Sequence, residues 1–252
     1  IKDMSINFKH IVPKFKKNFN PKVGLIALSN DYTIESDFNT VCRDLPLEIF
    51  INRIHNQSPL TKDNLLKMQD ELESVAKKIL PDEKIDTIAY GCTSGTIAIG
   101  EDKVKKKILQ AKPDCYVTTP ITSAIKAFNE MSIKKIAVFT PYPESVNKII
   151  FEYFTKKNIE VLSFASLNLD LESDIAKIDP KYLLETLTKL DTVNADALFI
   201  SCTALPVLKI LEEVERKIHK PALSSNQTLI WDTIRSIGYK SSVKGYGKLL
   251  RN

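Results

Sequence analysis

The sequence predicts an α/β fold of two similar lobes, because short apolar runs alternate with helical patterns and one strand–turn–helix unit occurs twice. The first copy has an apolar run at residues 85–90, which leads through small polar residues around Cys92 into a helical pattern. The second copy has its apolar run at residues 195–200 and its cysteine, Cys202, 110 residues after the first. Both cysteines therefore follow a predicted buried strand.

Two further pairs of segments support an internal duplication. A Lys-Pro pair precedes a short predicted strand in both halves, at residues 112–113 and 220–221. The apolar run at residues 22–26 resembles the one at residues 135–139. Three matched features in the same order, at nearly one spacing, indicate that the second half repeats the first.

We expect each half to form a Rossmann-like lobe, with a parallel sheet flanked by helices. The N-terminal lobe would comprise residues 1–118 plus 225–252, and the C-terminal lobe residues 119–224. In open α/β sheets, ligands bind off the carboxyl ends of the strands. We therefore expect the active site in the cleft between the two lobes, with both cysteines facing it.

The elements of the first half follow from local patterns. The run at 48–54 alternates like a strand, and apolar residues recur at helical spacing through 61–80. In chain order we expect a basic arm laid over the body at 1–22, a strand at 23–28, a polar turn at 29–35 opening a helix to about Arg43, a strand at 48–54, a helix at 61–80, the Cys92 unit to about Gln110, a strand at 114–117 and a helix at 121–131.

The second half repeats this alternation with one gap. Asp179 followed by Pro180 is typical of a helix start, with an N-cap and a proline in the first turn. Residues 165–178 are mostly polar and give no assignment. The remaining expectations are a strand at 135–139, a helix at 145–157, a strand at 160–164, a helix from 180 to about 190, the Cys202 unit with Pro206 early in its helix, a strand at 222–224 and a helix at 227–237.

Composition favours a globular protein without nucleic-acid or membrane partners. Of 252 residues, 43% are hydrophobic and 27% charged, and the net charge of +5 comes from lysines scattered over many predicted helices. No apolar run approaches the roughly 20 residues of a membrane span, and no signal peptide is visible. Four cysteines do not make a disulfide framework, so we expect a reducing cytoplasm.

Common cofactor and metal motifs are missing from the sequence. The only Gly-x-Gly, at residues 245–247, does not follow a strand, so the dinucleotide fingerprint is absent. His10, His55 and His219 are isolated and lack paired metal-ligand spacing. We therefore expect no cofactor and no metal.

Two facing thiols suit proton transfer at a carbon next to a carboxylate. One cysteine, as thiolate, would remove the proton, and the other, as thiol, would deliver a proton to the opposite face. A free thiol titrates near about 8.5, so we expect a helix N-terminus or a nearby donor to lower the pKa of the base. Cys42 and Cys115 are expected in the core.

Polar residues at predicted strand ends would bind the substrate and meet the charge that grows on its carboxylate. Asp31 and Thr33 also suit helix capping, so for Asp31 both roles stay open. The catalytic candidates are Cys92 and Cys202, and the substrate-binding candidates are Asn30, Asp31, Thr93, Ser94, Thr140, Tyr142, Thr203, Ser225 and Asn226.

Three motifs resemble the Asp/Glu racemase superfamily: Gly-Cys-Thr-Ser at 91–94, Ser-Cys-Thr at 201–203, and the segment 221–231 with Ser-Ser-Asn-Gln and Trp231. Within that superfamily the chain is similar to the branch of arylmalonate decarboxylase, maleate cis-trans isomerase and the ectoine-utilisation protein EutA. Residues 31–35, 90–94 and 118–122 look most like EutA. The similarity covers about residues 23–238.

The resemblance implies cofactor-free chemistry between two pseudosymmetric lobes. The decarboxylases keep only the cysteine at the position of Cys202 and use hydroxyls matching Thr93, Ser94 and Tyr142. The maleate isomerases use both cysteines, one as a nucleophile on the double bond, and usually carry asparagine at the position of Asn30.

The first functional expectation is a two-cysteine racemase or epimerase of a small carboxylated, amino-acid-like compound, with a link to ectoine-type catabolism. The alternatives are cis-trans isomerisation of a small unsaturated diacid, an arylmalonate-type decarboxylation, and a carboxylate-binding module without catalysis. We also expect a homo-oligomer, either a dimer or a tetramer.

Overall fold

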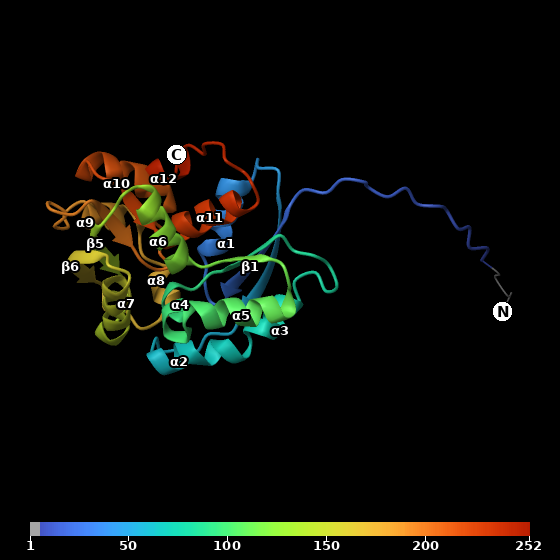
Figure 1. Ribbon diagram of the computed structural model, residues 1–252, viewed down its shortest axis with the longest axis horizontal. Coiled ribbons are helices and arrows are strands. Elements are labelled where there is room, and N and C mark those ends of the chain that lie inside the picture. Colours follow the sequence, from blue (N-terminus) through green and yellow to red (C-terminus); the bar gives the residue numbers. More distant parts are fainter. Residues whose placement is uncertain (1–5) are drawn as a thin grey trace.

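The computed structural model describes residues 6–252, and residues 1–5 of the expected N-terminal lobe lie outside the described part. The chain forms two separate four-stranded sheets, both entirely parallel, with helices packed around them (Figure 1). Their strand orders are β2-β1-β3-β4 and β6-β5-β7-β8, so the second sheet repeats the topology of the first. The predicted fold class is confirmed.

The first sheet centres on β1 (Lys22–Leu28), which pairs with β2 (Glu48–Ile54) and β3 (Thr87–Tyr90). The edge strand next to β3 is β4 (Tyr116–Thr118). Six of seven β1 residues and all four β3 residues are buried, which is typical of strands covered on both faces. The helices of this half are α1 (Ile34–Cys42), α2 (Lys62–Lys67), α3 (Leu72–Lys77), α4 (Thr93–Ile99) and α5 (Glu101–Ala111), with a 3-10 turn, η1, at Met68–Asp70.

The second sheet centres on β5 (Lys135–Thr140), between β6 (Glu160–Ser166) and β7 (Ala197–Ile200). Its other edge strand is β8 (Ala222–Ser224). The helices that follow β4 are α6 (Pro120–Glu130), α7 (Glu144–Lys156), α8 (Glu172–Ile175), α9 (Pro180–Leu187), α10 (Leu211–Ile218), α11 (Ser225–Ser236) and α12 (Lys248–Arg251), with a 3-10 turn, η2, at Leu208–Ile210.

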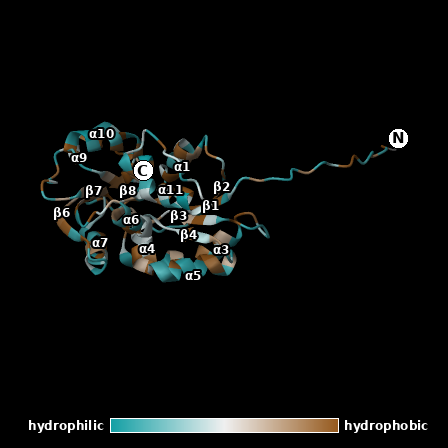
Figure 2. Ribbon diagram, turned by 45° about the horizontal axis from the view of Figure 1, so that its top comes forward, coloured by the Kyte–Doolittle hydropathy of each residue, from teal (hydrophilic) through white to brown (hydrophobic). Residues whose placement is uncertain are grey.

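The core runs through both halves of the body. Apolar strands lie at its centre, and hydrophilic residues lie on outer helices such as α5 and α10 (Figure 2). Helices α6 and α11 pack along one another, and α11 also contacts α1, β3 and β8. Phe128 of α6 joins Phe154 and Phe199 in an aromatic cluster with edge-on contacts at ring distances of 5.5 and 5.6 Å. These contacts connect α6 to the second sheet and α11 to both sheets.

The N-terminal arm differs from its prediction. Residues 6–20 are exposed and extend away from the body instead of lying over it (Figure 1). Large apolar side chains along it are exposed, among them Phe8 and Phe15.

Three predicted helices are broken or delayed. The helix predicted at 61–80 is divided into α2, η1 and α3. The helix after Cys92 breaks at Gly100, whose φ of 96° lies in the left-handed region that favours glycine. After Cys202 the chain turns instead of starting a helix, and regular structure resumes only at Leu208. Pro206 explains the delay, since it lacks an N–H and disfavours helical backbone in the residue before it.

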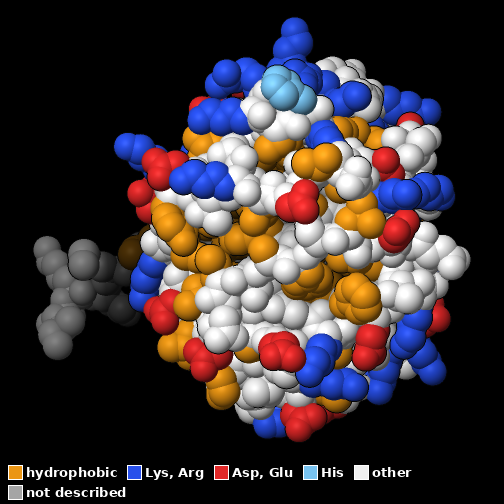
Figure 3. Space-filling view, turned by 90° about the vertical axis from the view of Figure 1, so that its left-hand side faces the viewer, with side chains coloured by type: hydrophobic (Ala, Val, Ile, Leu, Met, Phe, Trp, Pro, Cys, Tyr) orange, Lys and Arg blue, Asp and Glu red, His pale blue; other side chains and the backbone are white. Residues whose placement is uncertain are grey.

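One face of the molecule shows how the charges are distributed (Figure 3). Lysine and arginine side chains are interspersed with acidic ones around apolar groups, rather than gathered in a field of one sign. Of the helices in residues 6–252, none is both long enough and apolar enough to cross a lipid bilayer.

Candidate active site

Cys92 lies where the first sheet meets a helix. It follows β3 with extended backbone and acts as the N-cap of α4, where its Sγ accepts a hydrogen bond from the N–H of Gly95 at 3.2 Å. The side chain is 3% exposed. A Cβ on Gly95 would come within 2.7 Å of this sulfur, so the glycine permits the close approach of the helix start to the thiol.

Cys202 occupies the matching place after β7 in the second sheet. Its φ of 140° is rare for a residue with a side chain, and strain of this kind is concentrated at functional sites. The Cys202 N–H donates to Ser225 Oγ at 3.0 Å, which fixes the turn. Its thiol is 2% exposed and donates to Glu172 Oε1 at 3.7 Å. The two cysteines thus lie at equivalent strand ends of two sheets with the same strand order.

Several predicted residues hold the two halves of the site together. Asp31 accepts from Thr203 Oγ1 at 2.8 Å and also from two backbone N–H groups at the start of α1. Thr93 and Ser225 share a hydroxyl–hydroxyl hydrogen bond at 2.8 Å. Asn226 donates to the Thr203 carbonyl at 2.8 Å. For Asp31, both roles left open by the sequence apply, since it caps a helix and lies at the site.

The other predicted residues differ in whether their polar side-chain atoms already have hydrogen-bond partners. Ser94 Oγ lies 4.0 Å from Cys92 Sγ, and Asn30 has a buried Oδ1 without a hydrogen-bond partner. Tyr142 is 2% exposed, and its hydroxyl lies close to both thiols. The Thr140 hydroxyl instead donates to Asn147 and so supports the turn before α7. Asn30, Ser94 and Tyr142 therefore have polar groups left to meet a ligand.

Sequence reasoning missed Glu172 and Tyr90. Glu172 begins α8 inside the segment that had no assignment, and it is 4% exposed with Oε2 unpartnered. Tyr90 is a fully buried β3 residue whose hydroxyl lies close to Cys92 and 3.5 Å from the sulfur of Met68. No pattern distinguishes Glu172 from neighbouring acidic residues, whereas Tyr90 could have been found from its place two residues before Cys92.

The thiols differ from the expectation of a lowered pKa. Burial, and then the nearby charge of Glu172, raise the pKa of Cys92 to about 12, although the Gly95 N–H opposes this. The same two causes raise the pKa of Cys202 well above its usual value, against the Tyr142 hydroxyl and the Ala204 N–H. Desolvation outweighs the donors at the start of α4 because neither sulfur reaches solvent. Burial and the charge of Asp31 raise the pKa of Glu172 to about 8.

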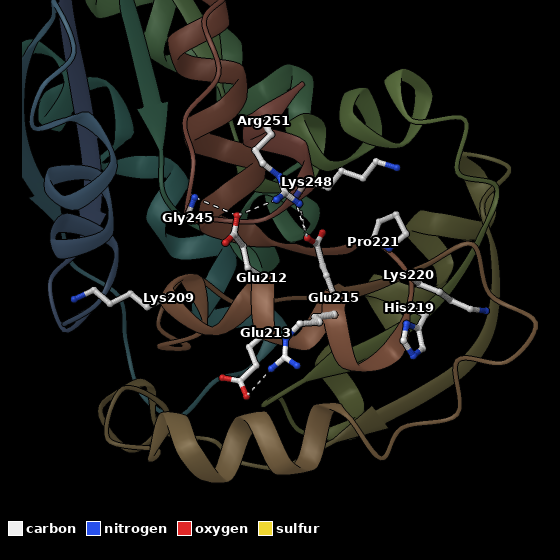
Figure 4. A pocket seen from close by; sticks show the side chains of 11 residues that line it. Lys209, Glu212, Glu213, Glu215, His219, Lys220, Pro221, Gly245, Lys248 and Arg251 are labelled. Atoms are coloured by element: carbon white, nitrogen blue, oxygen red, sulfur yellow. Dashed lines mark hydrogen bonds and ion pairs between the residues drawn. The ribbon is translucent and has the colours of Figure 1, made fainter.

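A surface pocket lies away from both cysteines. It has a volume of about 710 Å³ and is lined by α10 and the C-terminal segment, with neither cysteine among its residues (Figure 4). Its acidic groups are already paired, since Glu212 and Glu215 accept from the backbone of Gly245 and Lys248 and pair with Arg251. These contacts hold the C-terminal segment against α10.

A smaller pocket of about 340 Å³ lies beside the site. It is lined by Thr33 and Asp37 of the first half and by Ala176 and Pro206 of the second. Thr33 donates to the Ala204 carbonyl at 2.7 Å, and Asp37 accepts from Asn226 at 2.8 Å. Thr33 and Asp37, which line the pocket, therefore hydrogen-bond to residues close to Cys202. In residues 6–252 no three histidine, cysteine or acidic side chains gather as metal ligands.

The fold and site define a two-lobed α/β protein with one cysteine at the matching strand end of each lobe. The family model described as arylmalonate decarboxylase matches residues 58–250, and the chain belongs to this family. It is 26% identical to the maleate isomerase of Geobacillus stearothermophilus over 243 residues, which cover 91% of this chain and 96% of the relative.

Solved structures agree on the fold. The maleate isomerase Iso from Pseudomonas putida S16 aligns with a TM-score of 0.85 at 22% identity, over 92% of this chain and 98% of that one. A cysteine-to-serine mutant of the Nocardia farcinica maleate cis-trans isomerase, with a covalently bound succinylcysteine intermediate, aligns with a TM-score of 0.84 at 19% identity over the same shares. The resemblance to the arylmalonate decarboxylase and maleate isomerase branch is confirmed.

Proposed function

We propose that this protein is a cofactor-independent isomerase of a small carboxylate that uses Cys92 and Cys202. The observation that carries the proposal is their placement: each thiol is buried at the same strand end of one repeat, and Glu172 lies close to both. Two thiols that share one site can divide the work between a thiolate and a thiol. A binding module would have no use for this pair.

Cis-trans isomerisation is the first candidate reaction, because relatives named maleate isomerase match nearly the full chain. One thiolate would add to an alkene carbon, forming a C–S bond while the π electrons move towards the carboxylate. The other thiol would protonate the neighbouring carbon. After rotation about the new single bond, removal of that proton and loss of the thiolate restore the alkene. In the Nocardia farcinica structure the bound species is a succinylcysteine.

Inversion at a carbon next to a carboxylate is the second candidate, favoured by an acidic side chain beside Cys202. Such a side chain suits an amino-acid-like substrate better than a plain diacid. One thiolate would take the proton from the carbon, leaving the electron pair on the carboxylate as an enediolate. The other thiol would then donate a proton to the opposite face, so that the centre inverts.

The Ser94 and Tyr142 hydroxyls support either reaction as donors to the substrate carboxylate. Both are buried near the thiols, where a hydrogen bond to growing negative charge is worth more than in water. Asn30 contributes a buried amide at the end of β1.

Turnover in D2O separates the candidate reactions. Inversion should place deuterium on the inverted carbon. Isomerisation should yield a rotated double bond that gains deuterium only as far as the proton from the second thiol exchanges with solvent. Decarboxylation should release CO2 with one solvent hydrogen on the product. Mass spectrometry of the product and CO2 detection read all three.

Variants test the roles of the cysteines. Cys92→Ser and Cys202→Ser should each abolish turnover, whereas Cys115→Ser, at a buried cysteine outside the site, should not. Near wild-type rates in either site variant would refute the two-thiol mechanism. The closer relation to EutA and to ectoine catabolism stays a prediction from the sequence motifs.

A further inference from the structure

Glu172 is a buried acid at the centre of the site with half of its carboxylate unused. Glu172 is the first residue of α8, and its Oε1 accepts a hydrogen bond from the Cys202 thiol at 3.7 Å. Oε2 is buried and has no hydrogen-bond partner within residues 6–252. A buried carboxylate oxygen without a donor costs free energy, so such a group usually has a functional partner.

The groups that face Glu172 are neutral or acidic. Asp31 contributes negative charge from the first half, and Tyr142 and the two thiols surround the same space. Within the described chain Glu172 takes part in no salt bridge. Arg53, whose charge acts on Asp31, is engaged elsewhere, since it donates to Glu35 and to the Asp31 carbonyl. Residues 6–252 supply donors for a substrate carboxylate but none for Glu172 Oε2.

We propose that Glu172 accepts a hydrogen bond from an N–H group of the substrate, an ammonium or a primary amide close to the reacting carbon. The substrate class would then be a small carboxylate that carries nitrogen, in place of a plain diacid. This inference rests on the proposed isomerase function and adds the group that the enzyme recognises. Above about pH 8, where Glu172 is ionised, a plain diacid would bring a second carboxylate against Asp31 and Glu172, and these like charges repel.

The same contact would help the thiols to react. The Glu172 charge is the second cause that holds the pKa of both thiols high, after burial. Where Glu172 is ionised, above about pH 8, an ammonium on Oε2 would offset that charge and make a thiolate easier to form. Substrate binding and thiol activation would then be coupled through one side chain.

Binding of three ligands of matched carbon skeleton tests the proposal by calorimetry. They are succinate without nitrogen, succinamate with an amide, and aspartate with an ammonium. We expect wild-type protein to bind at least one nitrogen ligand about tenfold or more tightly than succinate, as for a charge-assisted hydrogen bond. A gain for aspartate alone identifies an ammonium, and a gain for succinamate alone identifies an amide. Succinate binding as tightly as both, or no binding by either nitrogen ligand, would overturn the proposal.

Two variants test whether the Glu172 carboxylate causes the preference for nitrogen ligands. Glu172→Gln keeps the shape and should lose most of the preference for aspartate. Asp174→Asn removes the same charge from an exposed position in the same helix and should behave as wild type. If Glu172→Gln keeps the full preference, the inference fails. Unfolding curves of both variants establish that each is folded before binding is measured.

Proton release gives an independent readout. Burial raises the pKa of Glu172 to about 8, so free protein at pH 7 holds a proton there that an ammonium ligand displaces. Calorimetry in buffers of different ionisation enthalpy should show this release in wild type and not in Glu172→Gln. A third outcome would contradict the inference: succinate binds wild type tightly, its binding weakens above pH 8, and Glu172→Gln still binds it. The protonated Glu172 carboxyl would then be a donor to a diacid.

Failure of this inference and failure of the isomerase function have different signatures. Essential cysteines without any nitrogen preference would refute only the inference. A nitrogen preference lost in Glu172→Gln, with turnover retained in both site-cysteine variants, would refute only the two-thiol reaction.

Discussion

Thr203→Val tests whether the hydrogen bond between the two halves of the site stabilises the fold. Thr203 Oγ1 donates to Asp31 Oδ2 at 2.8 Å, and both side chains are buried, at 2% and 1% exposed. Valine matches threonine in shape, so the substitution removes the donor without opening a cavity. It leaves Asp31 with its two backbone donors, from Thr33 at 2.7 Å and Ile34 at 3.0 Å.

The expected cost follows from what the carboxylate loses. A hydrogen bond to a charged group contributes about 1.5–3 kcal/mol, and two remaining donors place this case near the middle, at about 2 kcal/mol. For a chain of this size that corresponds to a fall in Tm of about 4–8 °C. Thr155→Val is the matched control, because Thr155 also donates one side-chain hydrogen bond, to the Phe151 carbonyl, but is exposed. Its cost should stay within about 0.5 kcal/mol.

Urea and thermal unfolding of both variants measure the difference. Thr203→Val should also lose turnover, because Thr203 adjoins Cys202 and its hydroxyl holds Asp31 at the site. A Thr203→Val protein no less stable than Thr155→Val would contradict the assignment of this bond as a link between the halves.

Three further predictions concern pH, packing and assembly. Because the pKa of Glu172 is raised to about 8 and that of Asp37 to about 7, the folded protein holds protons that the unfolded chain releases, so the free energy of unfolding should fall as pH rises from about 5 to 8. In Glu172→Gln, Tm should fall less steeply as pH rises. An unchanged dependence of Tm on pH would contradict the raised pKa of Glu172. Gly95→Ala should lower both Tm and turnover, since the new methyl group would lie 2.7 Å from Cys92 Sγ; wild-type kinetics would show that the helix start shifts freely. Sedimentation should show the expected dimer or tetramer, and a monomer at all concentrations would exclude it.

Local pattern was enough for most of the fold. The apolar run at 222–224 matches the buried strand β8, and the alternating run at 48–54 matches the partly buried edge strand β2. The repeated Cys92 and Cys202 units predicted the duplicated topology, which the equal strand orders confirm. The two-lobe residue boundaries stay a prediction. Where the sequence carried a breaker, as at Gly100 and Pro206, the predicted helix ended earlier or began later.

The site depended more on tertiary structure. Sequence position placed both thiols at strand ends, but only packing decided that burial and Glu172 raise the pKa of Cys92 instead of lowering it. Glu172 itself lies in a polar segment where its local sequence resembles any exposed helix start. Its carboxylate is buried because α8 packs against strand ends far away in sequence. Desolvation is a property of everything around a group, so the chain alone gives the chemical groups, and the fold decides which of them lose water.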